Sequence, residues 1–293
     1  MGIAATAPAL GSRSDDNGLM QVFVTGGGRG FIAGHVVHAL ERAGHDVRHD
    51  WVDVRDRAAL QRAVRDCEAV VHVAALYSYT ASASEMEAIN VGGTRNLLRA
   101  VRGTHIAVVY FSTDYVFDGA KGSPYVESDG THPLSVYGRS KLLGERAVVL
   151  RTAWVYAAQG KNFLLTMLRL MRERGAVRVV ADQYGTPTSA ESIARALWAI
   201  AQRPKLHGIL HWTDAGKASW YDFALAIAEE GHAAGLLSME VKVTPITTAD
   251  YPTAAHRPAN SALDTRASIA QLGLAPPPWR DNLRATLAHI GAA

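Results

Sequence analysis

Residues 21–35, QVFVTGGGRGFIAGH, join a short apolar run to a helix-like segment through a glycine-rich loop. Glycine lets the backbone turn sharply and approach a ligand closely, and the start of the following helix favours a negatively charged group. Gly27, Gly30 and Ala33 fit the spacing G-x-x-G-x-x-A. A strand, a glycine-rich turn and a helix in this order are typical of a dinucleotide-binding unit. The stretch therefore predicts a nucleotide-binding α/β fold.

Downstream of this loop, apolar strand-like runs alternate with helix-like segments. The runs lie at 46–54, 69–75, 106–113 and 147–156. Such alternation is typical of a parallel sheet that helices cover on both faces. The predicted fold class is therefore α/β, a doubly wound parallel sheet of the Rossmann type.

Beyond Tyr156 the alternation becomes irregular, and proline-rich stretches follow at 251–260 and 275–279. We therefore expect a smaller C-terminal lobe that binds substrate. The predicted division is a disordered extension at 1–19, a dinucleotide-binding domain at 20–156 to which 184–205 returns, and a smaller lobe made of 157–183 and 206–293.

Composition and charge restrict the partners. The 293 residues are 48% hydrophobic and 19% charged, with a formal net charge of +3 that is spread along the chain, so we expect no nucleic-acid partner. No apolar run approaches the ~18 residues that a membrane span needs, so we expect no membrane partner. Cys67 is the single cysteine, which excludes an intrachain disulfide and favours a cytoplasmic location. A homodimer is the expected assembly.

The type of dinucleotide depends on the end of the second strand-like run. Asp50 there favours NAD(H), because a carboxylate binds a ribose hydroxyl. Arg48, with Arg29 in the glycine loop, favours NADP(H), because a guanidinium binds phosphate through two hydrogen bonds. Two arginines against one aspartate favour NADP(H), with NAD(H) as the alternative. Asp53 is a candidate for the adenine amino group, or else a helix N-cap.

Polar residues at the end of the run 106–113 are candidates for the chemistry. Ser112 and Thr113 lie where ligands bind in open α/β sheets, beyond the carboxyl ends of strands. Tyr137 and Lys141 follow about 24 residues later, one helical turn apart on one face. A nearby ammonium lowers the pKa of a phenol, so Tyr137 could protonate an alkoxide while Thr113 donates a hydrogen bond to the same oxygen.

Other candidate sites are given a structural interpretation. His35 and His38 lie three residues apart in a predicted helix, but no carboxylate or cysteine accompanies them, so no metal site is predicted. Cys67 has no partner to activate it and is interpreted as a structural thiol.

The glycine loop, the Ser-Thr pair and Y-x-x-x-K together resemble the extended short-chain dehydrogenase/reductases. More narrowly, the chain from residue 20 onward resembles the dTDP-4-dehydrorhamnose reductase (RmlD-like) family. The segments that carry this resemblance are STDYVFDG, VYGRSKLLGE, RTAWVY, NFLLTMLRL, DQYGTPT, GILHWTDAGKASWYDFA, YPTAAHRPANSALD and PWRDNL.

This resemblance implies hydride transfer from NAD(P)H to a ketone, in that family the C4 carbonyl of a dTDP-6-deoxyhexose. It implies Thr113, Tyr137 and Lys141 as the catalytic set. The residues it implies for substrate binding are Asp114, Val116, Trp154, Asn162 and Arg257. The full set expected to hold the cofactor is Gly27, Gly28, Arg29, Gly30, Phe31, Ile32, Arg48, Asp53, Val54, Ala74, Ala75, Tyr137 and Lys141.

One segment departs from the family pattern. LYSYTASASEMEAIN, residues 76–90, is shorter than its counterpart in that family and nearly uncharged, and it looks more like the sugar-nucleotide epimerases of the same superfamily. The alternatives are therefore a reductase of a small cyclic or aryl ketone, an NAD-dependent sugar-nucleotide epimerase, and a non-catalytic nucleotide-binding regulatory subunit. A dehydratase is disfavoured, because Tyr115 stands where that branch carries a glutamate.

Overall fold

The computed structural model describes residues 19–28, 30–77, 81–145, 148–201, 203, 206–238, 240–252 and 257–291. The predicted extension, except residue 19, and the predicted cofactor contact Arg29 therefore lie outside the described residues. In the described part no helix is both long and apolar enough to cross a membrane.

A six-stranded parallel sheet forms the larger part of the molecule and confirms the predicted doubly wound fold. Its strand order is β10-β5-β4-β3-β1-β2. The order reverses between β1 and β3, and ligands of such sheets bind at this reversal, beyond the carboxyl ends of the strands. The strands are β1 (Gln21–Val24), β2 (Asp46–Arg48), β3 (Ala69–His72), β4 (Ala107–Thr113), β5 (Val148–Thr152) and β10 (Ile209–His211).

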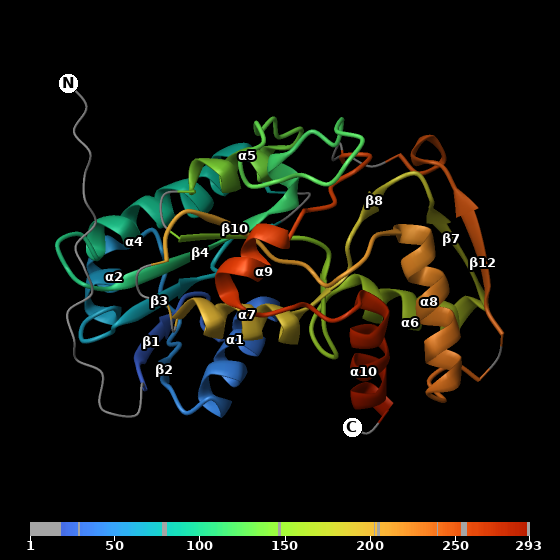
Figure 1. Cartoon of the computed structure of the whole chain (residues 1–293), viewed down its shortest axis with the longest axis horizontal. Coiled ribbons are helices and arrows are strands. Elements are labelled where there is room, and N and C mark those ends of the chain that lie inside the picture. The colour runs from blue at the N-terminus through green and yellow to red at the C-terminus, as the bar shows by residue number, and fades with distance from the viewer. Residues whose placement is uncertain are drawn as a thin grey trace.

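Both faces of this sheet are covered because its strands are apolar on both sides. Side chains alternate along a strand: Val22 and Val24 pack against α1 (Phe31–Arg42) and α7 (Ala190–Ala201), whereas Phe23 packs against α2 (Arg57–Ala63) and α4 (Thr94–Ala100). In Figure 1, α4 and α5 (Val136–Leu143) lie above the sheet, and α1 and α7 lie below it.

The C-terminal part has its own core, which lies to the right in Figure 1. It consists of α6 (Phe163–Arg174), α8 (Trp220–Ala233) and α10 (Trp279–Gly291) beside the parallel pair β7 (Ala176–Val180) and β12 (Lys242–Ile246). The remaining elements are α3 (Ala83–Met86), η1 (Glu87–Gly93), η2 (Asp114–Val116), β6 (Val155–Tyr156), β8 (Tyr184–Gly185), β9 (Thr188–Ser189), β11 (Ala218–Ser219), η3 (Thr248–Asp250) and α9 (Arg266–Leu272).

One part of the predicted division is wrong. The prediction places residues 206–293 in the smaller lobe, but β10 pairs in parallel with β5 at the edge of the large sheet. The physical reason is burial: Leu210 is fully buried in the core that the sheet shares with α1 and α7, and Leu272 of α9 joins the same core. A strand of three residues carries too little periodicity to be recognised in the sequence.

Candidate active site

The carboxyl end of β4 supplies two of the candidate residues. Thr113 is the last residue of β4, and its hydroxyl accepts a hydrogen bond from the Tyr115 N–H (3.2 Å), which caps η2. The same hydroxyl donates to Asp114 Oδ1 (3.0 Å). Thr113 is 8% and Asp114 2% exposed, so this pair is held below the surface at the edge where ligands of such sheets bind.

Helix α5 brings Tyr137 to the same place. Ser135 caps the start of this helix, and its hydroxyl accepts the Gly138 N–H (3.0 Å). A Cβ at position 138 would collide with the carbonyl oxygen of Tyr115, so only glycine lets the helix lie this close to η2. This close approach places Tyr137 within the electrostatic reach of Asp114.

Burial raises the pKa of the Tyr137 phenol, and the charge of Asp114 raises the pKa further. The phenol is therefore protonated at neutral pH, as a proton donor must be. The ring of Tyr77, which follows β3, meets the Tyr137 ring edge-on with the ring centroids 4.7 Å apart. Tyr77 is half exposed and lies in the segment that departs from the family pattern.

Lys141 is buried on the same helix, one turn after Tyr137. Its Nζ lies 4.1 Å from the centroid of the Tyr110 ring, and the Tyr110 hydroxyl donates to the Lys141 carbonyl (3.1 Å). Burial lowers the pKa of Lys141 to about 7, and the charge of Glu145 opposes this shift. Burial therefore dominates the pKa of both groups, and the expected lowering of the Tyr137 pKa by Lys141 stays a prediction.

The glycine loop joins the end of β3 at the point where the strand order reverses. Thr25 Oγ1 accepts the N–H groups of Val73 (3.1 Å) and Ala74 (3.0 Å) and contacts Nδ1 of the buried His72 (2.9 Å). A Cβ at Gly26 would lie 3.8 Å from the Ala74 Cα. The glycine loop that holds the predicted contacts Gly27 and Gly28 therefore lies against the segment that holds Ala74 and Ala75.

At the end of β2, Arg48 does not lie where the predicted contact with a cofactor phosphate would need it. Arg48 donates to the Arg65 carbonyl (2.8 Å) and to Gln21 Oε1 (3.3 Å), which lie at the amino end of the strands. Its guanidinium therefore points away from the glycine loop. Instead, His49 lies against Gly28 and Trp51 lies against Gly27.

The other residues predicted to hold the cofactor contact nearby parts of the protein. Asp53 forms an ion pair with Arg55, and hydrogen bonds from Arg55 lower the pKa of the Asp53 carboxyl to about 2. The alternative role of Asp53 as a helix N-cap is wrong, because Asp56 caps α2. Val54 is buried against Gly93. Phe31 lies beside Gly160, and Ile32 packs on the sheet core.

Sequence reasoning missed Asn90, which lies in the π-helical segment η1. Its Nδ2 donates to the Leu76 carbonyl (3.1 Å) and to Ser140 Oγ (2.9 Å), and its Oδ1 accepts the Leu76 N–H (2.7 Å). Ser140 in turn donates to the Tyr137 carbonyl (2.8 Å). Asn90 therefore ties the loop after β3 to the helix that carries Tyr137. An asparagine within a helix-like run gave no signal of this role.

The residues expected to bind substrate are spread over both parts of the molecule. Asp114 and Val116 are buried in η2. Trp154 follows β5 with φ +46, and its indole stacks on Trp220 with centroids 3.6 Å apart. A φ in this region is strained for a residue with a side chain and is found at ligand sites.

Two further residues expected to bind substrate lie in the C-terminal half. Asn162 caps α6 by accepting the Leu165 N–H (3.1 Å), and it donates to the Ala157 carbonyl (3.0 Å). Both ends of its side-chain amide therefore bond to the protein's own backbone. Arg257 is half-buried and directly follows residues 253–256, which lie outside the described part.

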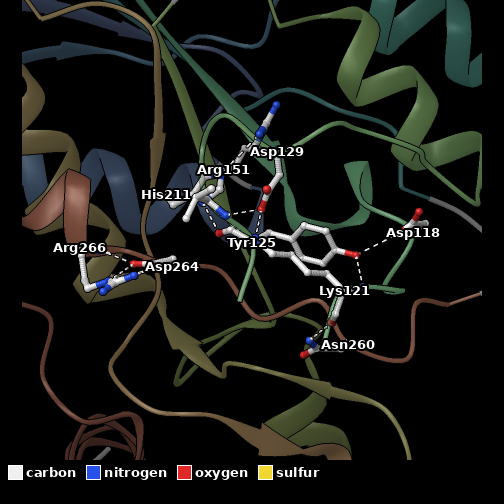
Figure 2. Close-up of polar contacts among 10 residues, drawn as sticks. Asp118, Lys121, Tyr125, Asp129, Arg151, His211, Asn260, Asp264 and Arg266 are labelled. Atoms are coloured by element: carbon white, nitrogen blue, oxygen red, sulfur yellow. Dashed lines mark hydrogen bonds and ion pairs between the residues drawn. The ribbon is translucent and has the colours of Figure 1, made fainter. Parts of the chain in front are cut away.

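Contacts with the C-terminal region fix the loop that leaves the site after η2. Figure 2 shows the Tyr125 hydroxyl bonded to Asp118 (2.7 Å) and Asn260 bonded to the Lys121 carbonyl (2.9 Å). Lys121 also pairs with Asp129 (2.5 Å). The loop is therefore tied to the C-terminal region, and the candidate site combines a protonated phenol, a threonine hydroxyl and a buried amine.

Comparison with known proteins identifies the family. The model of the RmlD substrate binding domain matches residues 20–291. A dTDP-4-dehydrorhamnose reductase from Burkholderia thailandensis is 40% identical over 287 residues, with 89% of this chain and 96% of that protein covered. The dTDP-4-dehydrorhamnose reductase of Escherichia coli K12 is 35% identical, with 87% and 88% covered.

Solved structures agree with these relatives. The crystal structure of dTDP-4-dehydrorhamnose reductase from Bacillus anthracis in complex with NADP is 28% identical, covers 92% of this chain and 99% of that chain, and has a TM-score of 0.84. Since the family model spans nearly all of the described residues, this chain belongs to the RmlD substrate binding domain family.

Proposed function

We propose that this protein is an NADPH-dependent reductase that transfers hydride to the C4 ketone of dTDP-4-dehydrorhamnose. Two of the relatives are named dTDP-4-dehydrorhamnose reductase, and the related Bacillus anthracis structure contains NADP. The observation that supports the proposal is that Thr113 ends β4 and bonds to Asp114, whose charge acts on the Tyr137 phenol, while Lys141 is buried one turn further along α5. A cytoplasmic location is part of the proposal and is supported by the single, buried cysteine, Cys67.

The glycine loop fits a dinucleotide. Gly26, Gly27 and Gly28 have φ values of +97, +71 and +60, which residues with side chains rarely adopt. Helix α1 begins at Gly30 without a side-chain cap and without an acidic residue in its first turn. Its free N–H groups suit the pyrophosphate of a dinucleotide.

The cofactor supplies the hydride, and the residues of this chain supply the proton and the orientation. Tyr137 donates its phenolic proton to the oxygen of the reduced carbonyl. Thr113 donates a hydrogen bond to the same oxygen, and the positive charge of Lys141 stabilises the negative charge that develops there. In this family pattern Lys141 also holds the nicotinamide ribose.

The test is reduction of dTDP-4-dehydrorhamnose by the purified protein, followed by NADPH oxidation and by identification of the deoxyhexose product. We expect Tyr137→Phe to lose at least about a hundredfold in kcat. Tyr251→Phe is the matched control, because Tyr251 is 57% exposed and should change nothing. Turnover confined to small cyclic or aryl ketones would refute the sugar-nucleotide substrate. Tightly bound NAD without net NADPH consumption would instead indicate an epimerase.

A further inference from the structure

The hydroxyl of Thr113 has a single proton, and in this structure that proton is already used. The hydroxyl donates to Asp114 Oδ1 (3.0 Å) and accepts from the Tyr115 N–H (3.2 Å). A hydroxyl group can donate only one hydrogen bond. Thr113 therefore cannot donate to a ketone oxygen while Asp114 accepts its proton.

Asp114 occupies a setting that suits a neutral carboxylic acid. Its side chain is fully buried, and Oδ2 makes no hydrogen bond within the described part of the chain. A buried carboxylate with an unsatisfied oxygen is costly, whereas the protonated acid has less charge to solvate. Burial raises the pKa of Asp114 to about 7, and the nearby hydroxyl groups of Ser261 and Thr113 oppose part of this rise.

The groups around Asp114 favour its negative charge only through hydrogen bonds, and these offset the effect of burial only in part. From α5, the titratable group that faces it is Tyr137, whose pKa rises when Asp114 is charged. From the C-terminal region the neighbour is the neutral hydroxyl of Ser261, and from η2 it is the backbone of Tyr115. The ammonium of Lys141 lies over the Tyr110 ring and has Glu145 as its charged neighbour.

We propose that Asp114 is a positioning residue that works in its protonated form and releases the Thr113 hydroxyl to the reacting oxygen. The protonated carboxyl donates a hydrogen bond to Thr113 Oγ1, and the threonine hydroxyl is then free to donate its own hydrogen bond to the ketone oxygen. Asp114 keeps its proton throughout, because the proton that ends on the product oxygen comes from Tyr137. Ionised Asp114 again accepts the hydrogen bond of the Thr113 hydroxyl and adds a negative charge beside the developing alkoxide, so it opposes reduction.

This inference rests on the proposed reductase function, and its test uses Asp114→Asn. The amide Nδ2 of asparagine donates to Thr113 Oγ1 at every pH and so imitates the protonated acid. A group with a pKa of about 7 loses about nine-tenths of its proton between pH 6 and pH 8. The ratio of kcat/KM of the parent to that of Asp114→Asn should therefore fall about tenfold over this range. Because Lys141 titrates in both proteins, the ratio removes its contribution.

The matched control is Asp118→Asn, which makes the same change at a partly exposed carboxylate four residues along the loop. The ratio of kcat/KM of the parent to that of Asp118→Asn should stay constant from pH 6 to pH 8. A constant ratio for Asp114→Asn as well would overturn the proposal.

A second measurement separates this inference from the proposed function. The infrared difference spectrum of the parent minus Asp114→Asn, recorded at pH 6, should contain the carbonyl band of a buried protonated carboxylic acid. Loss of that band by pH 8 is expected, and its absence at pH 6 would overturn the inference. Failure to reduce any ketone with the band present would instead refute the reductase function.

Discussion

Removing the charge of Glu145 tests how much its buried ion pair with Arg151 contributes to stability. Its carboxylate accepts from Arg151 Nε (2.9 Å) and Nη2 (2.7 Å) and from Ser112 Oγ (2.6 Å). The two side chains of the ion pair are 5% and 2% exposed. Figure 2 shows Arg151 beside His211, whose pKa burial lowers to about 4, so the histidine is neutral and supplies no charge. Glu145 is therefore the charged partner of Arg151 in this cluster.

Glu145→Gln leaves a buried guanidinium without a counter-charge. Removing one partner of a buried ion pair costs about 3–5 kcal/mol of unfolding free energy. For a chain of this length class that corresponds to a fall in Tm on the order of 10 °C. The double variant Glu145→Gln with Arg151→Met should be more stable than the sum of the two single losses predicts, because neither buried charge is left alone.

The same substitution should change the pH dependence of the reaction. Glu145 raises the pKa of Lys141, so its loss lowers that pKa further below about 7. The charged fraction of Lys141 then decreases at neutral pH, and the alkaline fall of kcat should shift to lower pH. Calorimetry and pH profiles of NADPH oxidation measure the two effects.

The matched control for Glu145→Gln is Glu173→Gln. Its ion pair with Arg169 is exposed, at 52% and 60%, and is worth less than about 1 kcal/mol. If Glu145→Gln melts within about 2 °C of the parent and of Glu173→Gln, the buried-pair argument is wrong.

Three further outcomes are expected. Thr113→Val should lower kcat by about 10²–10³, while Thr113→Ser retains most of it, because only the hydroxyl reaches the oxygen. Gly138→Ala should destabilise the protein and abolish reduction, since a Cβ there collides with the Tyr115 carbonyl, whereas Gly92→Ala, with 3.8 Å to the nearest atom, should fold normally in thermal melts. Lys141→Met should abolish turnover yet raise Tm at pH 6, because it removes a buried charge.

The sequence predicts the sheet and the reacting groups because both depend on short-range patterns. Runs that are apolar on both sides, such as residues 69–72, predict strands covered by helices on both faces, and the structure has them. Tyr137 and Lys141 share a helix face because of their spacing alone. The shift in their pKa values was not predictable, because burial is its main cause and depends on the tertiary fold.

The parts that the sequence did not reveal are tertiary contacts of ordinary-looking residues. Asn90 appears in a helical run, yet its amide joins α5 to the loop after β3. Arg48 has the right charge for a phosphate, but its guanidinium binds Arg65 and Gln21 instead. Charge and position in the sequence do not fix the direction of a long side chain, so such assignments need coordinates.

The two buried ionisable groups of the site, Asp114 and Lys141, together lower the free energy of unfolding most near pH 7. The pKa of Asp114 is raised to about 7, so the folded protein binds more protons than the unfolded chain between about pH 4 and 7, and stability falls as pH rises through this range. The pKa of Lys141 is lowered to about 7, so the unfolded chain binds more protons between about pH 7 and 10.5, and stability rises there. Each shift amounts to roughly 4 kcal/mol. At neutral pH the fold is therefore less stable than it would be without these two groups. Such a loss of stability is common at sites that are selected for activity.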